Sequence, residues 1–426
     1  MDFRELIPPL SRRERMVFAV LSLVAAVMRW PAVSKSLWDW DEALFVLAVR
    51  EYDVAAFHPH PPGFPLFIAL AKLLPLDEFR ALQTLVVVAS LFVFPAAFFL
   101  ARELRASFFT ACAAGLLLAF MPNVWFYGGT AFSDVPSMVL SMVASALLLR
   151  GCRGDRALLA GCVVLGIAAG IRPQNVLIAA APLLIAFLCK RRTTILGAAI
   201  VTLIVIASYG GAALATGDVA AYRTAIAEHG QYIRATDSFL SEIRPSLIQV
   251  ADDFFLRPFR APLINVILAV LMLIGLVRRR PPALYALAIF GPFLLFAWLF
   301  LDFHSASRFS VAYMPLFAIL AAEGLDFAQV RVPALAAVVA VIVIWMWPAL
   351  RVVHTTDSPP VAALKSVQGR PIEFDASLGA HVAALHRQGD GPPAKLKEGT
   401  GPKTFARPRE RLSGIARPRY FEVAVD

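Results

Sequence analysis

The sequence predicts an all-α protein that crosses a membrane many times, and three observations support this fold class. Of its 426 residues, 59% are hydrophobic, and the mean hydropathy is +0.70. Apolar runs of membrane-spanning length recur from Met16 to Leu350, and they are continuous rather than alternating, which indicates helices and not a β-barrel. Lys and Arg gather in short clusters between these runs, as in proteins whose topology is set by positive charge.

The basic clusters predict about eleven spans, with the N-terminus in the cytoplasm and the C-terminus outside. The +10 net charge therefore reflects topology and not nucleic-acid binding. The four cysteines lie in or beside apolar runs, without metal-ligand spacing or a disulfide framework. The expected spans are 15–33, 81–101, 108–128, 134–150, 157–171, 174–189, 194–216, 261–277, 281–301, 309–325 and 332–350.

Two long outer loops and a tail complete the expected architecture. The first loop, 34–80, contains a helical pattern from Glu42 to Val54, which predicts a short helix lying on the membrane surface. Its apolar run 63–75 is too short to span and is expected to be re-entrant or interfacial. The second loop, 217–259, reads as an amphipathic helix that either roofs a cavity or lies on the lipid surface. We expect a transmembrane catalytic domain over 1–350, and an extracytoplasmic tail or small α/β domain over 351–426.

The acids of the first outer loop are the candidate catalytic groups. Asp39, Asp41 and Glu42 lie within four residues, directly after the first span. Transfer of a sugar from a phosphate leaving group to a hydroxyl needs one carboxylate to remove the proton. Asp41 or Asp39 suits this role, and Glu42 would orient the partner or bind a cation. The competing interpretation is that these acids cap the following helix.

Other unusual polar residues fall on the same outer face. Arg172, beside Gln174 in the sequence Arg-Pro-Gln-Asn, and Arg308, which opens a late apolar run, suit a phosphodiester by charge and fork geometry. Alternatively, each arginine snorkels at a span end or pairs with an acid such as Asp134. Asp134, which opens a span, is a second candidate substrate-binding acid or an N-cap.

Three histidines lie in the same outer loops. His58 and His60 stand among prolines whose extended backbone places alternate side chains on one side, and His304 lies in the last outer loop. They either contact substrate or complete a divalent metal site with an acid. No metal ligand set is assigned, and metal dependence stays open.

These motifs, in this order, resemble those of the GT-C glycosyltransferases over about residues 15–350. The shared features are an Asp-Glu in the first outer loop, a His-Pro-Pro before an apolar run, a later Ser-Asp-x-Pro, an Arg-Pro between spans and an Arg-Phe opening a late span. The nearest branch is that of protein O-mannosyltransferases and aminoarabinose transferases. The resemblance implies a GT-C bundle, a polyprenyl-phosphate-linked sugar donor, inversion of the anomeric centre and an extracytoplasmic site. It maps the base to Asp41, with Glu42 beside it, and the donor-phosphate contact to Arg308.

The sequence therefore predicts an integral-membrane glycosyltransferase of the cell envelope, whose acceptor is a lipid, a glycan or a protein. Two alternatives share part of this evidence. One is a transporter or flippase for a lipid-linked or anionic solute, although its charges would follow a path through the midplane. The other is an enzyme that modifies lipid A or undecaprenyl phosphate with a group other than a sugar.

Overall fold

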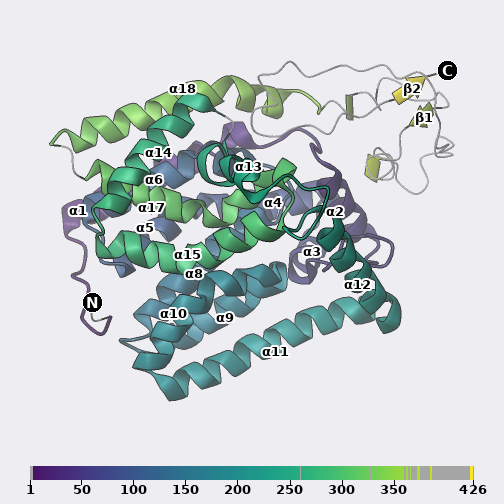
Figure 1. The fold of residues 1–426 in the computed structure, drawn as a ribbon, viewed down its shortest axis with the longest axis horizontal. Helices are drawn as coiled ribbons and strands as arrows, with labels where there is room; N and C mark the ends of the chain where they lie inside the picture. The colour runs from purple at the N-terminus through teal and green to yellow at the C-terminus, as the bar shows by residue number, and fades with distance from the viewer. Residues whose placement is uncertain are drawn as a thin grey trace.

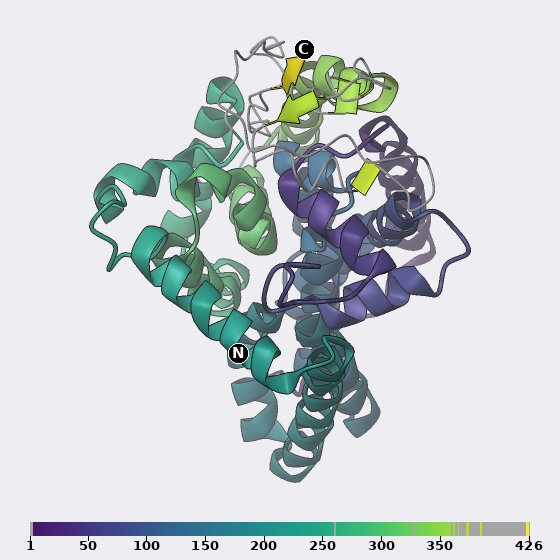
Figure 2. The same cartoon turned by 90° about the vertical axis from the view of Figure 1, so that its right-hand side faces the viewer.

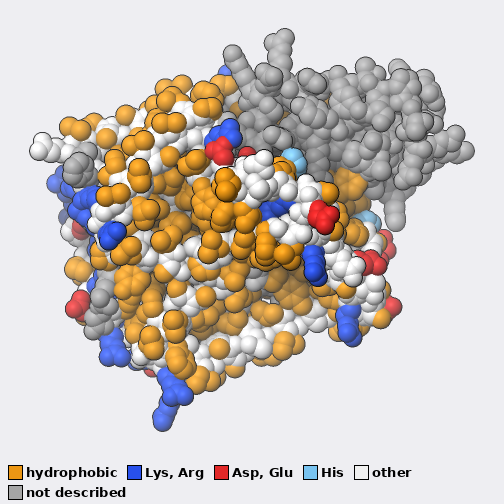
Figure 3. Space-filling view, in the orientation of Figure 1, with side chains coloured by type: hydrophobic (Ala, Val, Ile, Leu, Met, Phe, Trp, Pro, Cys, Tyr) orange, Lys and Arg blue, Asp and Glu red, His pale blue; other side chains and the backbone are white. Residues whose placement is uncertain are grey.

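The computed structural model describes residues 3–259, 261–326, 329–358, 361–362, 365, 372–374, 384–385 and 423–425. Within these ranges the chain forms a helical bundle, with one pair of short strands at its C-terminal end (Figure 1). Most of the tail 351–426 lies outside the described residues, so its folding stays a prediction. In Figure 3 the middle of the molecule is broadly apolar, and a group of Lys and Arg side chains lies along its left edge.

The helices are amphipathic only weakly, because lipid and protein interior both accept apolar side chains. In the first half they are α1 (Arg12–Val27), η1 (Trp30–Ala32), α2 (Trp40–Arg50), α3 (Pro65–Lys72), α4 (Glu78–Leu91), α5 (Val93–Glu103), α6 (Phe108–Phe120), α7 (Pro122–Tyr127), α8 (Asp134–Arg150), α9 (Asp155–Ile171), η2 (Pro173–Asn175), α10 (Val176–Cys189) and α11 (Arg191–Ala215).

The second half continues the bundle and ends in the strand pair. Its elements are α12 (Val219–Thr236), α13 (Leu247–Ala251), the π-helix η3 (Asp252–Leu256), α14 (Pro262–Val277), α15 (Pro281–Phe300), η4 (Phe303–Ser305), α16 (Ala306–Phe309), η5 (Ser310–Tyr313), α17 (Met314–Leu325), α18 (Arg331–Thr355), β1 (Ile372–Phe374) and β2 (Val423–Val425). The two strands are antiparallel, with Ile372 opposite Val425.

The number of membrane spans is smaller than expected when length is applied strictly. Among the described residues, five helices are long and apolar enough to cross a membrane, or six if the bent pair α4 and α5 is one span. Other apolar helices, such as α6 and α10, have 13 and 14 residues and fall short of the roughly 20 that a bilayer needs. The chain is an integral membrane protein, and the count of eleven stays a prediction.

Helix α2 is largely buried inside the protein and is not the exposed surface helix that its pattern predicted. Every residue from Glu42 to Ala48 is buried. The expected helix is therefore present, but neighbouring segments cover its polar side at Glu42 as well as its apolar face. Its ring contacts include Phe45 against Phe64 and Phe67, with centroids 4.9 and 5.7 Å apart. The short run 63–75 forms only the eight-residue α3.

Gly129 joins the first outer loop to the segment that precedes α8. A side chain at this position would place its Cβ 1.8 Å from the carbonyl oxygen of Ala32, so the two backbones approach as only glycine allows. The Gly129 carbonyl accepts hydrogen bonds from the Ser34 backbone N–H at 2.9 Å and from the buried Gln83 side chain at 2.8 Å. The segments carrying Asp39 and Asp134 are thereby held together.

The end of α18 fixes the first outer loop from the other side. The Lys35 backbone N–H donates to the Val353 carbonyl at 3.0 Å, and the Ser358 backbone N–H donates to the Ser36 hydroxyl at 2.8 Å. Nδ1 of the His354 ring lies 2.8 Å from the carbonyl oxygen of Val33. We call these contacts the α18 clamp. Residues more than 300 positions apart thus set the position of the acids that follow Trp38.

Candidate functional site

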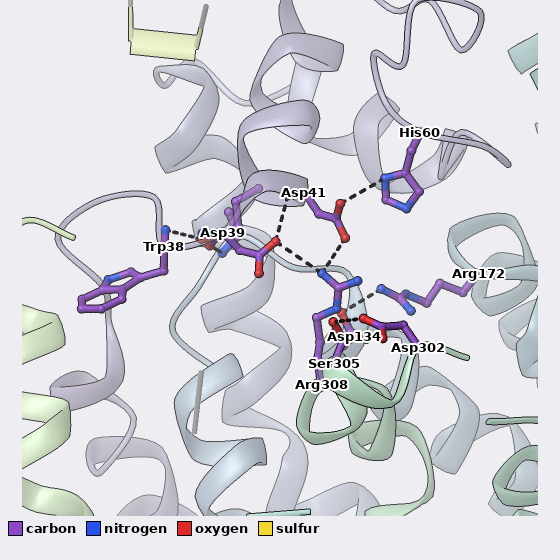
Figure 4. Close-up of polar contacts among 11 residues, drawn as sticks. Trp38, Asp39, Asp41, His60, Asp134, Arg172, Asp302, Ser305 and Arg308 are labelled. Atoms are coloured by element: carbon purple, nitrogen blue, oxygen red, sulfur yellow. Dashed lines mark hydrogen bonds and ion pairs between the residues drawn. The ribbon is translucent and has the colours of Figure 1, made fainter. Parts of the chain in front are cut away.

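The first turn of α2 presents its acids in different directions. Asp39 is the N-cap, and its Oδ1 accepts the backbone N–H of Asp41 at 3.0 Å. This is the capping interaction that Asp favours, because it satisfies one of the open N–H groups of the first turn. The Asp41 side chain instead turns toward the groups that lie across from α2 (Figure 4).

Glu42, the third acid, is buried, and its carboxylate accepts hydrogen bonds from backbone N–H groups. Its Oε2 accepts the backbone N–H groups of Trp38 at 2.5 Å and Asp39 at 3.1 Å, and its Oε1 accepts that of Ala131 at 2.7 Å. Burial raises the pKa of Glu42 to about 7, although the hydrogen bonds from these backbone groups act to lower it. Oε2 thus caps the start of α2, and Oε1 joins α2 to the segment before α8.

Arg308 is the partner of Asp41. Its Nη1 lies 2.6 Å from Oδ2 of Asp41 and 3.8 Å from Oδ1 of Asp39. The guanidinium carbon lies 4.7 Å from the ring centroid of Phe132 and 4.8 Å from that of Phe309, and 9% of the side chain is exposed. Nε of Arg308 is buried and has no hydrogen-bond partner among the described residues. This cation therefore has capacity for a further acceptor.

Arg172 forms a second ion pair next to the first. It caps the C-terminus of α9, where Pro173 ends the helix, and its Nη2 lies 2.7 Å from Oδ2 of Asp134. Its Nε donates to the Ser133 hydroxyl at 2.8 Å. Phe132, Ser133 and Asp134 are consecutive, so one short segment contacts both arginines (Figure 4).

His60 closes the site on the side opposite Arg308. Its Nδ1 lies 3.8 Å from Oδ1 of Asp41, and its ring stacks on Phe45 with centroids 5.8 Å apart. Burial lowers the pKa of His60 to about 4, and Arg308 adds to this, while Asp41 opposes it. The imidazole is therefore neutral near pH 7.

The structure brings six of the ten expected site residues together: Asp39, Asp41, His60, Asp134, Arg172 and Arg308. The remaining ones take other positions. His58 pairs through its backbone with Asp53, and His304 is exposed beside Phe303 with ring centroids 3.9 Å apart. Gln174 lies beside Arg172 in η2, and its Oε1 is buried without a partner among the described residues.

Two residues of the site carried no sequence signal of their own. Phe132 lies beneath Arg308 but reads in the sequence as one more apolar residue before a span. His229 of α12 lies 6.0 Å from His60 between ring centroids, but in the sequence it only contributes to an amphipathic pattern. The Tyr222 hydroxyl donates to the Pro62 carbonyl at 3.0 Å, so α12 lies beside the site (Figure 2).

An apolar cavity of 780 Å³ begins beside the second ion pair. Phe67, Pro136 and Ile171 line its near end, and Ile171 directly precedes Arg172. Glu103 and Arg150 line its far end. Along α8 the lining runs from Pro136 to Arg150, roughly 21 Å at 1.5 Å per residue, so the cavity extends through much of a bilayer's hydrocarbon thickness.

The histidines and acids of the outer loops are the candidate ligands for a divalent metal. Within the part of the chain that the structure describes, no group of three or more His, Cys, Asp or Glu side chains is placed to hold a metal ion. The closest ion pairs at this site join carboxylates to guanidinium groups.

Comparisons with known proteins identify the fold. No protein-family model and no curated protein matches the chain. ArnT from Cupriavidus metallidurans bound to undecaprenyl phosphate is similar with a TM-score of 0.54 and 15% identity, over 84% of this chain and 73% of ArnT. Archaeal oligosaccharyltransferase AglB from Archaeoglobus fulgidus, in complex with an inhibitory peptide and a dolichol-phosphate, is similar with a TM-score of 0.51 and 13% identity. That match covers 96% of this chain but 64% of AglB. The chain has the fold of GT-C glycosyltransferases, in agreement with the resemblance found in the sequence.

Proposed function

We propose that this protein is an inverting glycosyltransferase that moves a sugar from a polyprenyl-phosphate donor to an acceptor hydroxyl at the extracytoplasmic face. One observation carries the proposal: two buried arginines, each paired with a carboxylate, contact one short segment that leads to Pro136 at the near end of a long apolar cavity. A lipid whose head is a phosphodiester and whose tail is a hydrocarbon is complementary to this arrangement, because its anionic head suits the arginines and its tail suits the cavity.

The donor phosphate would bind Arg308 and Arg172, and the prenyl chain would lie in the cavity along α8. The unpartnered Nε of Arg308 supports this placement, because a phosphate oxygen is a strong acceptor for a guanidinium group. The similar ArnT is bound to undecaprenyl phosphate, and AglB is in complex with a dolichol-phosphate, which supports a lipid carrier of this class.

Asp41 is the proposed base, and Asp39 holds the helix that carries it. Asp39 uses its carboxylate to cap α2, whereas Asp41 lies between Arg308 and His60. Asp41 would remove the hydroxyl proton while the acceptor oxygen attacks the anomeric carbon from the face opposite the phosphate. Arg308 and Arg172 would stabilise the negative charge that develops on the departing phosphate.

The charge pattern supports an extracytoplasmic site. The turns after α5, α8, α10 and α14 carry Arg105, Arg153, Lys190 and Arg278, and basic side chains gather at the edge of the bundle seen at the left of Figure 3. Basic turns of this kind stay in the cytoplasm, and helices α2 and α12 lie toward the other end of the bundle (Figure 1). The N-terminus would then be cytoplasmic.

The proposal is tested by deleting the gene and comparing lipids and glycans by mass spectrometry. We expect the deletion to remove a sugar-bearing species and the wild-type gene to restore it. The Asp41→Asn gene should not restore this species, although the variant protein is inserted in the membrane. An Asp39→Asn variant separates the two acids, since capping by Asn preserves the helix and activity should largely remain. Full restoration by Asp41→Asn would reject Asp41 as the base.

A further inference from the structure

The two oxygens of Asp41 face different partners. Oδ2 is engaged with Arg308 at 2.6 Å, whereas Oδ1 faces Nδ1 of His60 at 3.8 Å. This second distance is longer than a hydrogen bond, and a hydroxyl oxygen beside the line that joins the two atoms would be within hydrogen-bond reach of each. Nδ1 of His60 is buried and has no hydrogen-bond partner among the described residues. A polar group placed there would satisfy it.

A row of ring faces leads from this gap to the surface of α12. The ring of His229 lies 6.0 Å from that of His60, and the ring of Tyr232 lies 6.3 Å from that of His229, nearly parallel at 16°. His229 and Tyr232 are three residues apart, which places both on one face of the helix. Exposure increases along the row, since His60 is 17% exposed at its side chain, His229 is half-buried and Tyr232 is 58% exposed. We call these three residues the ring platform.

We propose that the ring platform is the acceptor subsite, and that the acceptor is a carbohydrate whose sugar ring packs on His229 and Tyr232. This inference rests on the proposed function and names the acceptor class for the same site. Aromatic faces suit the apolar face of a sugar ring, while a few polar groups fix its orientation. A serine or threonine acceptor has too little apolar surface to cover the length from His60 to Tyr232.

The placement gives each atom of the transfer a defined role. The acceptor hydroxyl donates its hydrogen to Oδ1 of Asp41 and accepts one from Nδ1–H of His60, which is the tautomer that this role requires. On attack, the O–H bond breaks and Asp41 takes the proton, while the acceptor oxygen bonds to the anomeric carbon. The bond from that carbon to the phosphate oxygen breaks, and the phosphate keeps the electron pair beside Arg308. The lowered pKa of His60 agrees with a neutral imidazole as donor.

Ligand-observed saturation-transfer NMR on the full chain in phospholipid nanodiscs tests the subsite. The probes are methyl pyranosides, with N-acetylserine amide as the competing acceptor class. We expect saturation transfer to the pyranosides, weakened three- to tenfold by His229→Ala and by Tyr232→Leu, roughly the effect of one lost ring contact. Gln231→Ala is the matched control, because Gln231 is an exposed neighbour on the same helix. Tyr232→Leu changes a mostly exposed side chain and leaves the core intact.

Three results would overturn the subsite: no saturation transfer to any pyranoside, transfer that both variants leave unchanged, or stronger transfer to the serine derivative. Binding of undecaprenyl phosphate is measured on the same samples. If the lipid fails to bind the wild type, the proposed function is rejected, whatever the pyranosides do. If the lipid binds, but saturation transfer to the pyranosides is the same in His229→Ala and Tyr232→Leu as in the wild type, only the ring platform is rejected.

Discussion

Nη1 of Arg308 lies 2.6 Å from Oδ2 of Asp41, so the proposed base and the proposed phosphate ligand neutralise each other in the absence of donor. A donor phosphate would compete with Asp41 for this guanidinium group. Its arrival would then loosen the ion pair at the moment when Asp41 has a proton to remove. On the proposed mechanism, Arg308 would thereby couple donor binding to the release of the base.

Replacing Arg308 should therefore damage both roles. We expect Arg308→Ala to lower the transfer rate by about 10²–10³, similar to the loss of one donor that stabilises developing negative charge. Arg308→Lys should recover part of this rate, because it keeps the charge without the planar fork. The measurement is product formation in membranes with equal protein amounts. Arg192→Ala removes an exposed arginine from the first turn of α11, at the opposite, basic end of the bundle, and should have little effect. Unchanged transfer in Arg308→Ala would refute the coupling.

The apolar cavity should select the donor by its chain. Val143 lines the cavity about two helical turns beyond Pro136, and Val143→Trp would fill it. We expect weaker binding of undecaprenyl phosphate by at least about tenfold, because a blocked chain loses more than 1.4 kcal/mol of apolar contact. Geranyl phosphate is short enough to stop before Val143 and should bind as in the wild type. The lipid-facing Val163→Trp, with Val163 39% exposed on α9, is the matched control. Equal losses for both lipids would argue against a chain in this cavity.

The ion pair of Arg172 and Asp134 should be strongly coupled. Both side chains are about nine-tenths buried or more, at 11% and 4% exposed, so removing one leaves the other charged in a poor solvent. We expect a double-mutant cycle on thermal stability to give a coupling of about 2 kcal/mol or more. The exposed pair of Lys190 and Asp155, at 3.4 Å, should give about 0–1 kcal/mol. Similar values for the two pairs would show that burial does not strengthen the inner one.

Acid should destabilise the protein partly through His60. Its folded-state pKa is about 4 against an ordinary value of 6.5, so the unfolded chain binds this proton first as pH falls. The stability that the neutral ring provides is present above pH 6.5 and is lost between pH 6.5 and 4. Asp41, Arg308, His229 and Arg172 are the charged or titratable groups that act on it.

The check is the thermal midpoint of wild type and His60→Gln in nanodiscs from pH 7.5 to 4. Carboxylates that titrate in this range affect both proteins, so the informative quantity is the difference between the two curves. We expect the wild type to fall more steeply, since Gln carries no titrating group. Parallel curves would mean that the folded protein does not hold His60 in its neutral form.

The sequence predicted which residues form the site better than it predicted the contacts that these residues make. The charge of the basic loops predicted that Asp41, Arg172 and Arg308 share one face, and the structure places their side chains near one another. Helical periodicity also predicted α2, because its pattern is local. Neither the sidedness nor the pattern could show that α2 is buried on all faces, since that depends on which segments cover it.

Glu42 shows why contacts between distant parts of the chain could not be predicted from the sequence. Its partner Ala131 lies 89 positions away and contributes a backbone N–H, which leaves no trace in residue type. The expectation that Glu42 orients the partner or binds a cation followed from its neighbours in the chain and not from its neighbours in space. Phe132 was missed for a similar reason, because a phenylalanine before a span has no feature that marks it as a surface for Arg308.

The α18 clamp has a consequence for how the protein is made. Ribosomes release the acids of the first loop long before the segment that carries Val353 and Ser358. A nascent chain that has not yet delivered α18 therefore holds Asp41 without the contacts that fix the first loop. Competence for transfer would arise only after α18 has been made and packed, so that half-inserted chains leave lipid carriers intact.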